Sequence, residues 1–298
     1  MIVRERPSLY DILFAMRGSI LPRIAGRLVV IAALSVGAVW LARWRPAVFA
    51  PLSATPFTLI GIALSIFMSF RNSACYERWW EGRKLWGQLI IASRSFARQT
   101  ASLDAETRRQ LLYSLCGFAH GLNARLRGEP DAPRVAAWSA ARAWETLPNP
   151  TDAVLADIGL QCRRLADEGR IGEIHYSVLE AQLTEIGHVQ GGCERIAATP
   201  LPFAYSLLLH RTAHLFCLAL PFAFAGSLGW WTLLPVLLVS YTFFGLDALS
   251  DELQDPFGRE PNDLPLDAMT RLIERDLRAA LGEMELPPPL TAHRFVLL

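Results

Sequence analysis

The amino-acid sequence predicts an all-α, multi-pass membrane protein, with four transmembrane helices per chain continuous with a helical cytoplasmic region. Its 298 residues are 52% hydrophobic and only 19% charged, whereas soluble domains carry about a quarter charged residues. The stretches 28–42, 46–70 and 212–246 contain no Asp, Glu, Lys or Arg. An apolar stretch of about 20 residues crosses a bilayer as a helix. A soluble protein with four buried helices is the alternative, and it is disfavoured because core helices seldom lack charge over such lengths.

The first two uncharged stretches each predict one span, separated by a turn that holds Pro46 and Pro51. The third stretch is too long for one span and is interrupted between Gly226 and Gly229. Trp230 and its tryptophan neighbour follow this break, as in an interfacial aromatic belt. The predicted spans are residues 26–42, 55–70, 202–225 and 230–246.

The distribution of Lys and Arg predicts the orientation. Arginines are frequent in the N-terminal segment and between residues 71 and 195, whereas the second outer turn has none. The positive-inside rule therefore places both termini in the cytoplasm, although Arg43 and Arg45 in the first outer turn oppose it. Glu5 and Asp11 interrupt the N-terminal segment, so no cleavable signal peptide is predicted.

The central region has helical periodicity. Helices are predicted at residues 101–126, 151–169 and 184–198, with loops at 128–133 and around Pro148 and Pro150. No repeat or long linker divides the chain. We therefore expect one domain over residues 1–298, whose cytoplasmic part comprises residues 71–200 and 247–298.

Composition excludes several classes of function. A net charge of +1 removes the basic field of a nucleic-acid-binding protein. Five cysteines without C-x-x-C spacing suggest neither a disulfide framework nor a zinc site. The sequence lacks a phosphate-binding loop, a dinucleotide-binding fingerprint and a G-x-S-x-G elbow. It therefore predicts neither an enzyme nor a bound cofactor.

Polar residues near the last two spans leave alternatives open. His210 and His214 have the i, i+4 spacing of a metal-binding pair, but no further ligand lies near them in the sequence, so a polar contact between helices is favoured and no metal site is predicted. Arg211 either snorkels to the surface or pairs with a carboxylate. The acidic residues at the end of the fourth span form either a solvated face or a negative charge near an ion path. These are Asp247, Asp251, Glu252 and Asp255.

The second span carries two parallel stripes. Ile62, Ile66 and Phe70 recur every four residues and share one helical face. Gly61 begins a stripe of small residues, continued at positions 65 and 69, that allows close packing of a neighbouring helix. Periodicity alone favours contact of the bulky stripe with lipid.

The residues that follow this span resemble a known family. Residues 69–87, SFRNSACYERWWEGRKLWG, closely resemble the F-R-N-x-x-x-Y-x-R-[YFW]-W-E-like motif of bestrophins. Asp255-Pro256-Phe257-Gly258 resembles the family's N-P-F-G sequence after the last span. Four spans, a long helical middle region and a helical segment at Tyr10–Met16 agree with this resemblance, which covers roughly residues 5 to 280.

The resemblance implies a homopentameric ion channel in a lipid bilayer, with one axial pore for monovalent ions. By position, the three residues of its apolar neck correspond to Ile62, Ile66 and Phe70. The cytoplasmic aperture corresponds to Ile174, with Ile171 and Val178 as alternatives. Composition without long tails suggests a bacterial protein of the inner membrane.

Two departures from animal bestrophins affect the predicted function. The acidic calcium-binding run reads Arg259-Glu260-Pro261-Asn262-Asp263 here, so strong calcium activation is not expected, although Glu260 and Asp263 remain for a loosely held ion. Ile66 replaces a phenylalanine whose positive ring edge favours anions. The isoleucine removes that bias, and the resemblance to bacterial bestrophins, which as a group are expected to pass monovalent cations, implies a channel for monovalent cations such as sodium. A chloride or other anion channel, and a non-channel transporter or scaffold, are the alternatives.

Overall fold

The computed structural model describes residues 1–3, 16, 18–49, 55–139 and 143–298. Their regular secondary structure is helical, apart from isolated β-bridges that join Val296 to Ile2 and to His293. The predicted helical segment at Tyr10–Met16 lies, except for Met16, outside the described residues, as does Pro51.

The chain divides into two compact units. We call residues 5–78 and 200–254 the membrane unit, and residues 1–4, 79–199 and 255–298 the polar unit. The interpretation of residues 1–298 as one domain stays a prediction.

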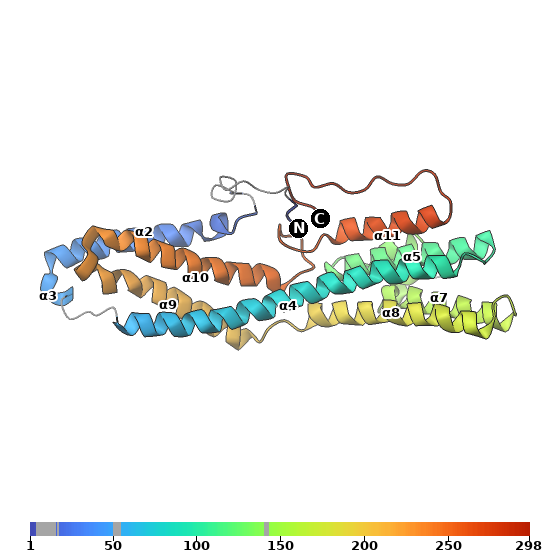
Figure 1. The fold of residues 1–298 in the computed structure, drawn as a ribbon, viewed down its shortest axis with the longest axis horizontal. Helices are drawn as coiled ribbons and strands as arrows, with labels where there is room; N and C mark the ends of the chain where they lie inside the picture. Colours follow the sequence, from blue (N-terminus) through green and yellow to red (C-terminus); the bar gives the residue numbers. More distant parts are fainter. Residues whose placement is uncertain (4–15, 17, 50–54, 140–142) are drawn as a thin grey trace. The chain divides into compact units, whose positions relative to one another are not determined.

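The membrane unit contains long apolar helices (Figure 1). These are α2 (Leu21–Trp44), the short α3 (Pro46–Phe49), the first part of α4 (Thr55–Gln99), α9 (Phe203–Leu228) and α10 (Leu233–Gln254). Three stretches are long and apolar enough to cross a membrane, namely Leu21–Trp44, Thr55–Gln99 and Phe203–Gln254. The third stretch contains both α9 and α10, so four crossings of the membrane stay a prediction.

Helices α9 and α10 pack as an antiparallel hairpin. Phe216 of α9 meets Phe243 of α10 edge to face, with ring centroids 5.5 Å apart, and His210 lies beside Asp247. Gly229 ends α9 at a φ of +52°, a conformation that favours glycine, and the 3₁₀ turn Gly229–Thr232 leads into α10.

Helix α4 continues without a break far beyond its apolar part. Its 45 residues correspond to roughly 68 Å at 1.5 Å per residue. The predicted span at 55–70 therefore begins at the first residue of α4, but the helix continues beyond the predicted end at residue 70. The only proline of α4 is Pro56, which lies in the first turn, where proline does not interrupt a helix.

The polar unit packs the second part of α4 with shorter amphipathic helices. These are α5 (Ala105–Leu126), α6 (Ala132–Ala136), α7 (Pro150–Asp167), α8 (Glu173–Ala198) and α11 (Leu266–Ala280). Asp104 caps α5 by accepting from the Thr107 backbone N–H at 3.0 Å, so α5 begins later than the predicted residue 101. Helix α8 begins 11 residues before the predicted 184 because the break in the chain lies at Gly169–Gly172, where Gly169 has a φ of +70°.

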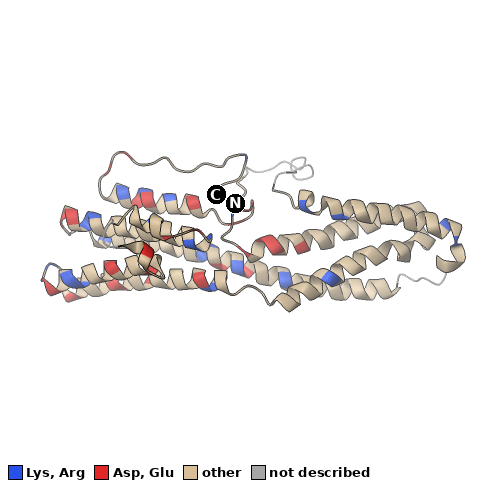
Figure 2. Cartoon of the chain, turned by 180° about the vertical axis from the view of Figure 1, so that it is seen from behind, with Lys and Arg blue, Asp and Glu red and all other residues tan. Residues whose placement is uncertain are grey.

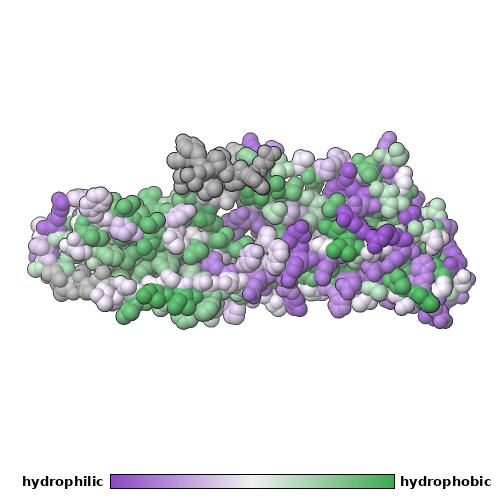
Figure 3. All heavy atoms as spheres, viewed as in Figure 1, coloured by the Kyte–Doolittle hydropathy of each residue, from purple (hydrophilic) through white to green (hydrophobic). Residues whose placement is uncertain are grey.

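Charge and hydropathy differ between the two units. Charged residues are sparse on α2, α9 and α10 and frequent on the helices of the polar unit (Figure 2). The visible face over the first part of α4 is largely hydrophobic (Figure 3). Val29, Leu59 and Leu215 each expose about two thirds of their surface. Such a surface suits contact with lipid rather than water.

Candidate functional site

The predicted neck residues all lie exposed on α4. Ile62, Ile66 and Phe70 are 56%, 50% and 62% exposed. Ile62 and Ile66 border an apolar groove that they share with Phe216 and Leu220 of α9. These three positions are therefore free to contact a surface outside the chain.

The face of α4 that packs within the chain is not the stripe of small residues. Between residues 55 and 70 of α4, the buried positions are Leu64 and Met68, at 3% and 0% exposure. Gly61 does lie close to α9, because a Cβ there would be 3.2 Å from the Phe216 ring. Ser65 and Ser69 are exposed, so any helix that covers them lies outside the chain.

The three candidates for the aperture differ in exposure. Ile174, in the first turn of α8, is 83% exposed and Val178 is 41% exposed. Ile171 is buried in the core of the polar unit at 6% exposure. Ile174 and Val178 are therefore available to line an aperture, whereas Ile171 serves the core.

A buried ion-pair cluster joins the helices of the membrane unit. Arg71 of α4 is 2% exposed, and its Nη1 donates to Oδ1 of the fully buried Asp247 at 2.8 Å. Its Nη2 donates to Asp251 at 2.6 Å. From α2, Arg27 approaches Asp247 to 3.5 Å and Arg23 pairs with Glu252 at 3.2 Å.

This cluster corrects the interpretation of the acidic residues at the end of the fourth span. Asp247 and Glu252 are buried rather than solvated, and arginines that face them offset their negative charge. The sequence identified Arg71 only as one residue of the motif at 69–87. It did not predict the ion pair, because the partner Asp247 is 176 residues away. Arg211 is exposed, and no carboxylate within the described ranges forms an ion pair with it.

The structure adds a third residue to the histidine pair of α9. Nδ1 of His210 lies 2.7 Å from Oδ2 of Asp247, and Nδ1 of His214 lies 2.7 Å from the His210 carbonyl oxygen. The two imidazole centroids are 4.2 Å apart. The predicted contact between helices is present, and the carboxylate that completes the group comes from α10.

The Asp-Pro-Phe-Gly segment of the polar unit is fixed by close packing. Phe257 is fully buried against α4, and a Cβ on Gly82 would lie 3.0 Å from its ring. A Cβ on Gly258 would lie 2.5 Å from Oδ2 of Asp263, so a larger residue there would have to displace this carboxylate. The Trp79 indole N–H donates to the Asn262 carbonyl at 3.0 Å. The two motifs of the sequence therefore hold each other in place.

Arg259 occupies the first position of the run that is acidic in the family resembled by the sequence. Its guanidinium donates to Glu129 at 2.6 Å and lies 3.5 Å from Asp267. This hydrogen bond lowers the pKa of Glu129 below its ordinary value of 4.5. Asp263 is buried, and its Oδ2 accepts from the Glu260 N–H at 2.7 Å. Arg259 therefore offsets the negative charge of Glu129 and Asp267.

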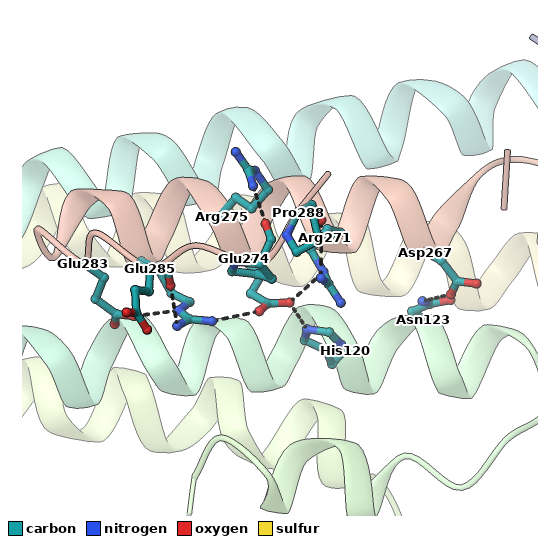
Figure 4. A network of polar contacts seen from close by, with 11 residues as sticks. His120, Asn123, Asp267, Arg271, Glu274, Arg275, Glu283, Glu285 and Pro288 are labelled. Atoms are coloured by element: carbon teal, nitrogen blue, oxygen red, sulfur yellow. Dashed lines mark hydrogen bonds and ion pairs between the residues drawn. The ribbon is translucent and has the colours of Figure 1, made fainter. Parts of the chain in front are cut away.

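A second polar network joins α5 to α11 in the same unit (Figure 4). The buried Glu274 accepts from His120 at 3.2 Å and forms ion pairs with Arg271 and Arg278. Burial alone would raise the pKa of Glu274, but the hydrogen bond from His120 and the neighbouring arginines outweigh it and lower the pKa. Helix α11 was not predicted as a separate element, and no sequence motif indicated this network.

The chain matches a known family over nearly its whole length. The model of the family described as "Bacterial/Fungal Bestrophin protein" matches residues 1–279. The voltage-dependent anion channel-forming protein mll4386 of Mesorhizobium japonicum is 45% identical over 300 residues, which cover 99% of this chain and 96% of that protein. The voltage-dependent anion channel-forming protein YneE of Escherichia coli is 39% identical, covering 99% and 98%.

Solved structures give the same result. The crystal structure of a bacterial bestrophin homologue from Klebsiella pneumoniae superposes with a TM-score of 0.84 at 38% sequence identity, covering 88% of this chain and 100% of that chain. The expected all-α fold is thus shared with a solved homologue.

Proposed function

The chain belongs to the bestrophin family, and from that premise we propose that it forms a homopentameric channel for monovalent ions. Bestrophins are ion channels, so the chain is not an enzyme. One observation carries the proposal for the pore. Ile62, Ile66 and Phe70 point out of the membrane unit of a single chain although all three are bulky and apolar. In an assembly that encloses an axial pore, all three side chains can line that pore.

Five copies of these residues form three stacked apolar rings, which are the neck. Such rings offer a passing ion no hydrogen-bonding group, so the neck closes by losing its water. Ile174, which is largely exposed, lines the cytoplasmic aperture, and Val178 is the second candidate for that ring. Arg71 and Asp247 support the neck from inside the bundle, because they tie α4 to α10 next to Phe70.

For selectivity, an anion channel is the first candidate, because relatives along the whole chain carry the name of anion channel-forming proteins. Those names give no support to the expectation of cation conduction, including sodium. Cation conduction is the second candidate, and Ile66 favours it because it presents no aromatic edge to an anion.

We assign the topology from charge and length. Helices α9 and α10 each have enough residues to cross the bilayer (26 and 22), so the third apolar stretch crosses twice and the chain crosses four times. The arginine-rich segments then lie on one side, with both termini in the cytoplasm of a bacterial inner membrane.

Calcium is expected to have little effect on the current. Tight calcium sites use six to eight oxygen ligands at about 2.4 Å, whereas this loop contributes the Arg259 guanidinium, which pairs with Glu129 and Asp267. Current that vanishes with a chelator and returns with micromolar calcium would contradict this. Substitution Arg259→Asp is the matched variant, and we expect it to increase sensitivity to calcium.

The experiment is a bilayer recording on the purified protein with a salt gradient. An ion current with a defined reversal potential supports the channel. Its sign separates anions from cations, because the two give opposite voltages in the same gradient. The mass of the protein in detergent should be five times the 33.1 kDa of the chain. A stable monomer or dimer overturns the assembly, and an absence of current from a confirmed pentamer overturns the channel in favour of a transporter or scaffold.

A further inference from the structure

Three metal-binding side chains of the membrane unit lie together at the hairpin of α9 and α10. One ligand atom from each of His210, His214 and Asp247 lies within 4.8 Å of the other two. Within the described part of the chain, no other group of three or more His, Cys, Asp or Glu residues has this arrangement. The proposed channel uses none of these atoms to line its pore.

The hydrogen bonds of His214 leave one ring nitrogen ready to bind a metal. Its Nδ1 lies 2.7 Å from the His210 carbonyl oxygen. A carbonyl oxygen only accepts hydrogen bonds, so Nδ1 carries the proton. This leaves Nε2, which points away from the carbonyl oxygen, as the nitrogen available to a metal.

The same reasoning applies to His210. Its Nδ1 faces Oδ2 of Asp247 at 2.7 Å. Arg71 donates to Oδ1 of this carboxylate at 2.8 Å, and Arg27 lies 3.5 Å from Oδ2, so cations face the carboxylate from α4 and α2. Nε2 of His210 is therefore likewise the nitrogen available to a metal. A carboxylate and a carbonyl behind two imidazoles are the usual partners of metal-ligating histidines.

The charge around the site allows a cation to enter. Three arginines of this cluster face three carboxylates, so the formal charges balance. They are Arg23, Arg27 and Arg71 with Asp247, Asp251 and Glu252. Imidazole nitrogens select zinc, copper and nickel, whereas calcium and magnesium prefer oxygen ligands.

We propose that His210 and His214 bind a divalent transition metal of the Zn²⁺ class through their Nε2 atoms, with Asp247 as the carboxylate that orients His210 and offsets the charge of the ion. Water completes the coordination. A metal held on α9 and supported from α10 stabilises the hairpin. The site is built only from the membrane unit, so the proposal stands whether or not the chain conducts ions.

The test uses the full-length protein, purified in detergent and freed of metal. Titration with Zn²⁺ against a chromogenic chelator should give one ion per chain with a dissociation constant in the micromolar range. The variants His210→Gln and His214→Gln should each weaken binding by about tenfold or more. His188→Gln, which removes an exposed histidine of the polar unit, is the matched control and should bind as the wild type does. An excess of calcium should not displace the zinc.

Circular dichroism and mass in detergent establish that each variant is folded. A wild-type protein that does not bind zinc overturns the proposal, as does undiminished binding in both histidine variants. Equal weakening in His188→Gln overturns it too, because the zinc would then lie elsewhere. If the variants do not fold, the absorption spectrum of Co²⁺ bound to the wild type decides, and a spectrum without bands of nitrogen coordination overturns the site.

Discussion

The side chain on which the membrane unit depends most is Arg71. It is 2% exposed and divides its hydrogen bonds between Asp247 and Asp251. Replacement by methionine leaves Asp247, which has no exposed surface, without its closest cation. Breaking a buried pair on one side costs about 3–5 kcal/mol. Arg71→Met should therefore lower the apparent melting temperature of the protein in detergent markedly, as measured by circular dichroism.

Two variants make this prediction specific. Arg71→Lys keeps the charge but not the planar fork that reaches two carboxylates, so we expect an intermediate loss. Arg211→Gln removes an exposed arginine and should leave the melting temperature unchanged. A melting temperature of Arg71→Met equal to that of the wild type would mean that the cluster contributes nothing to stability.

At the scale of helices, the sequence predicted the elements better than their ends. The starts of α4 and α9 were accurate to a residue, and each lies next to a proline, Pro56 and Pro202, which is tolerated only at the beginning of a helix. The end of α4 was missed because hydropathy changes at Arg71 while the backbone stays helical. The start of α8 was missed because its first two turns fully bury only Leu179, with Tyr176 partly buried beside it, which leaves little periodicity.

The site followed the same pattern. The stripe of Ile62, Ile66 and Phe70 was visible because its residues are close in the sequence. The pairing of Arg71 with Asp247, and of Arg259 with Glu129, depends on helices that meet only after folding. Local spacing does not encode such contacts. They required the parallel packing of α4 and α10, in which Arg71 meets Asp247 and Arg78 meets Gln254, and the packing of the polar unit.

The contact between α5 and α7 depends on one glycine. A Cβ on Gly121 would lie 2.8 Å from both Oγ1 of Thr151 and Cγ2 of Val135. Gly121→Ala should therefore destabilise the protein by about 1–3 kcal/mol, the usual cost of overpacking. In Gly159→Ala, on α7, the nearest atom would be 3.8 Å away, and alanine favours the helix by up to about 1 kcal/mol. Chemical unfolding monitored by helicity compares the two, and equal stability of both variants would refute this account of the contact.

The contact between α5 and α11 should make the stability of the folded protein depend on pH. Burial alone would raise the pKa of Asp267, but hydrogen bonds from Arg127 and Asn123 lower it below its ordinary 3.8. The pKa of Glu274 is also lowered. Both carboxylates therefore stabilise the folded state above their ordinary pKa values, and this contribution is lost as pH falls through their folded values.

The apparent melting temperature should consequently fall as the pH is lowered below about 4.5, the ordinary value for Glu274. A melting series from pH 7 to pH 3 measures this. Asp267→Asn should melt lower than the wild type at pH 7 and lose less on acidification. An acid response of the variant identical to that of the wild type would contradict the role of this carboxylate.

At the scale of the whole molecule, the exposed apolar residues are explained together by assembly. Ile62, Ile66 and Phe70 on the membrane unit and Ile174 on the polar unit have no cover within the chain. Ser65 and Ser69 are small and exposed beside them, as suits a face approached by a neighbouring copy of α4. In the proposed ring of five chains each surface has a role, because the bulky stripe would line the pore and the small stripe would permit close contact between copies.

The neck tests this arrangement directly. If Ile62, Ile66 and Phe70 form three apolar rings, Ile62→Ala or Ile66→Ala widens and wets the constriction, and the current should rise while the pentamer is retained. Ile66→Phe restores a ring of aromatic edges and should move the reversal potential towards that of anions. Ile60→Ala is the matched control, because Ile60 is 46% exposed but lies about 160° around the helix from Ile62. If the stripe instead faces lipid, all four substitutions leave current and reversal potential unchanged in a confirmed pentamer, since none of these side chains then meets the ion.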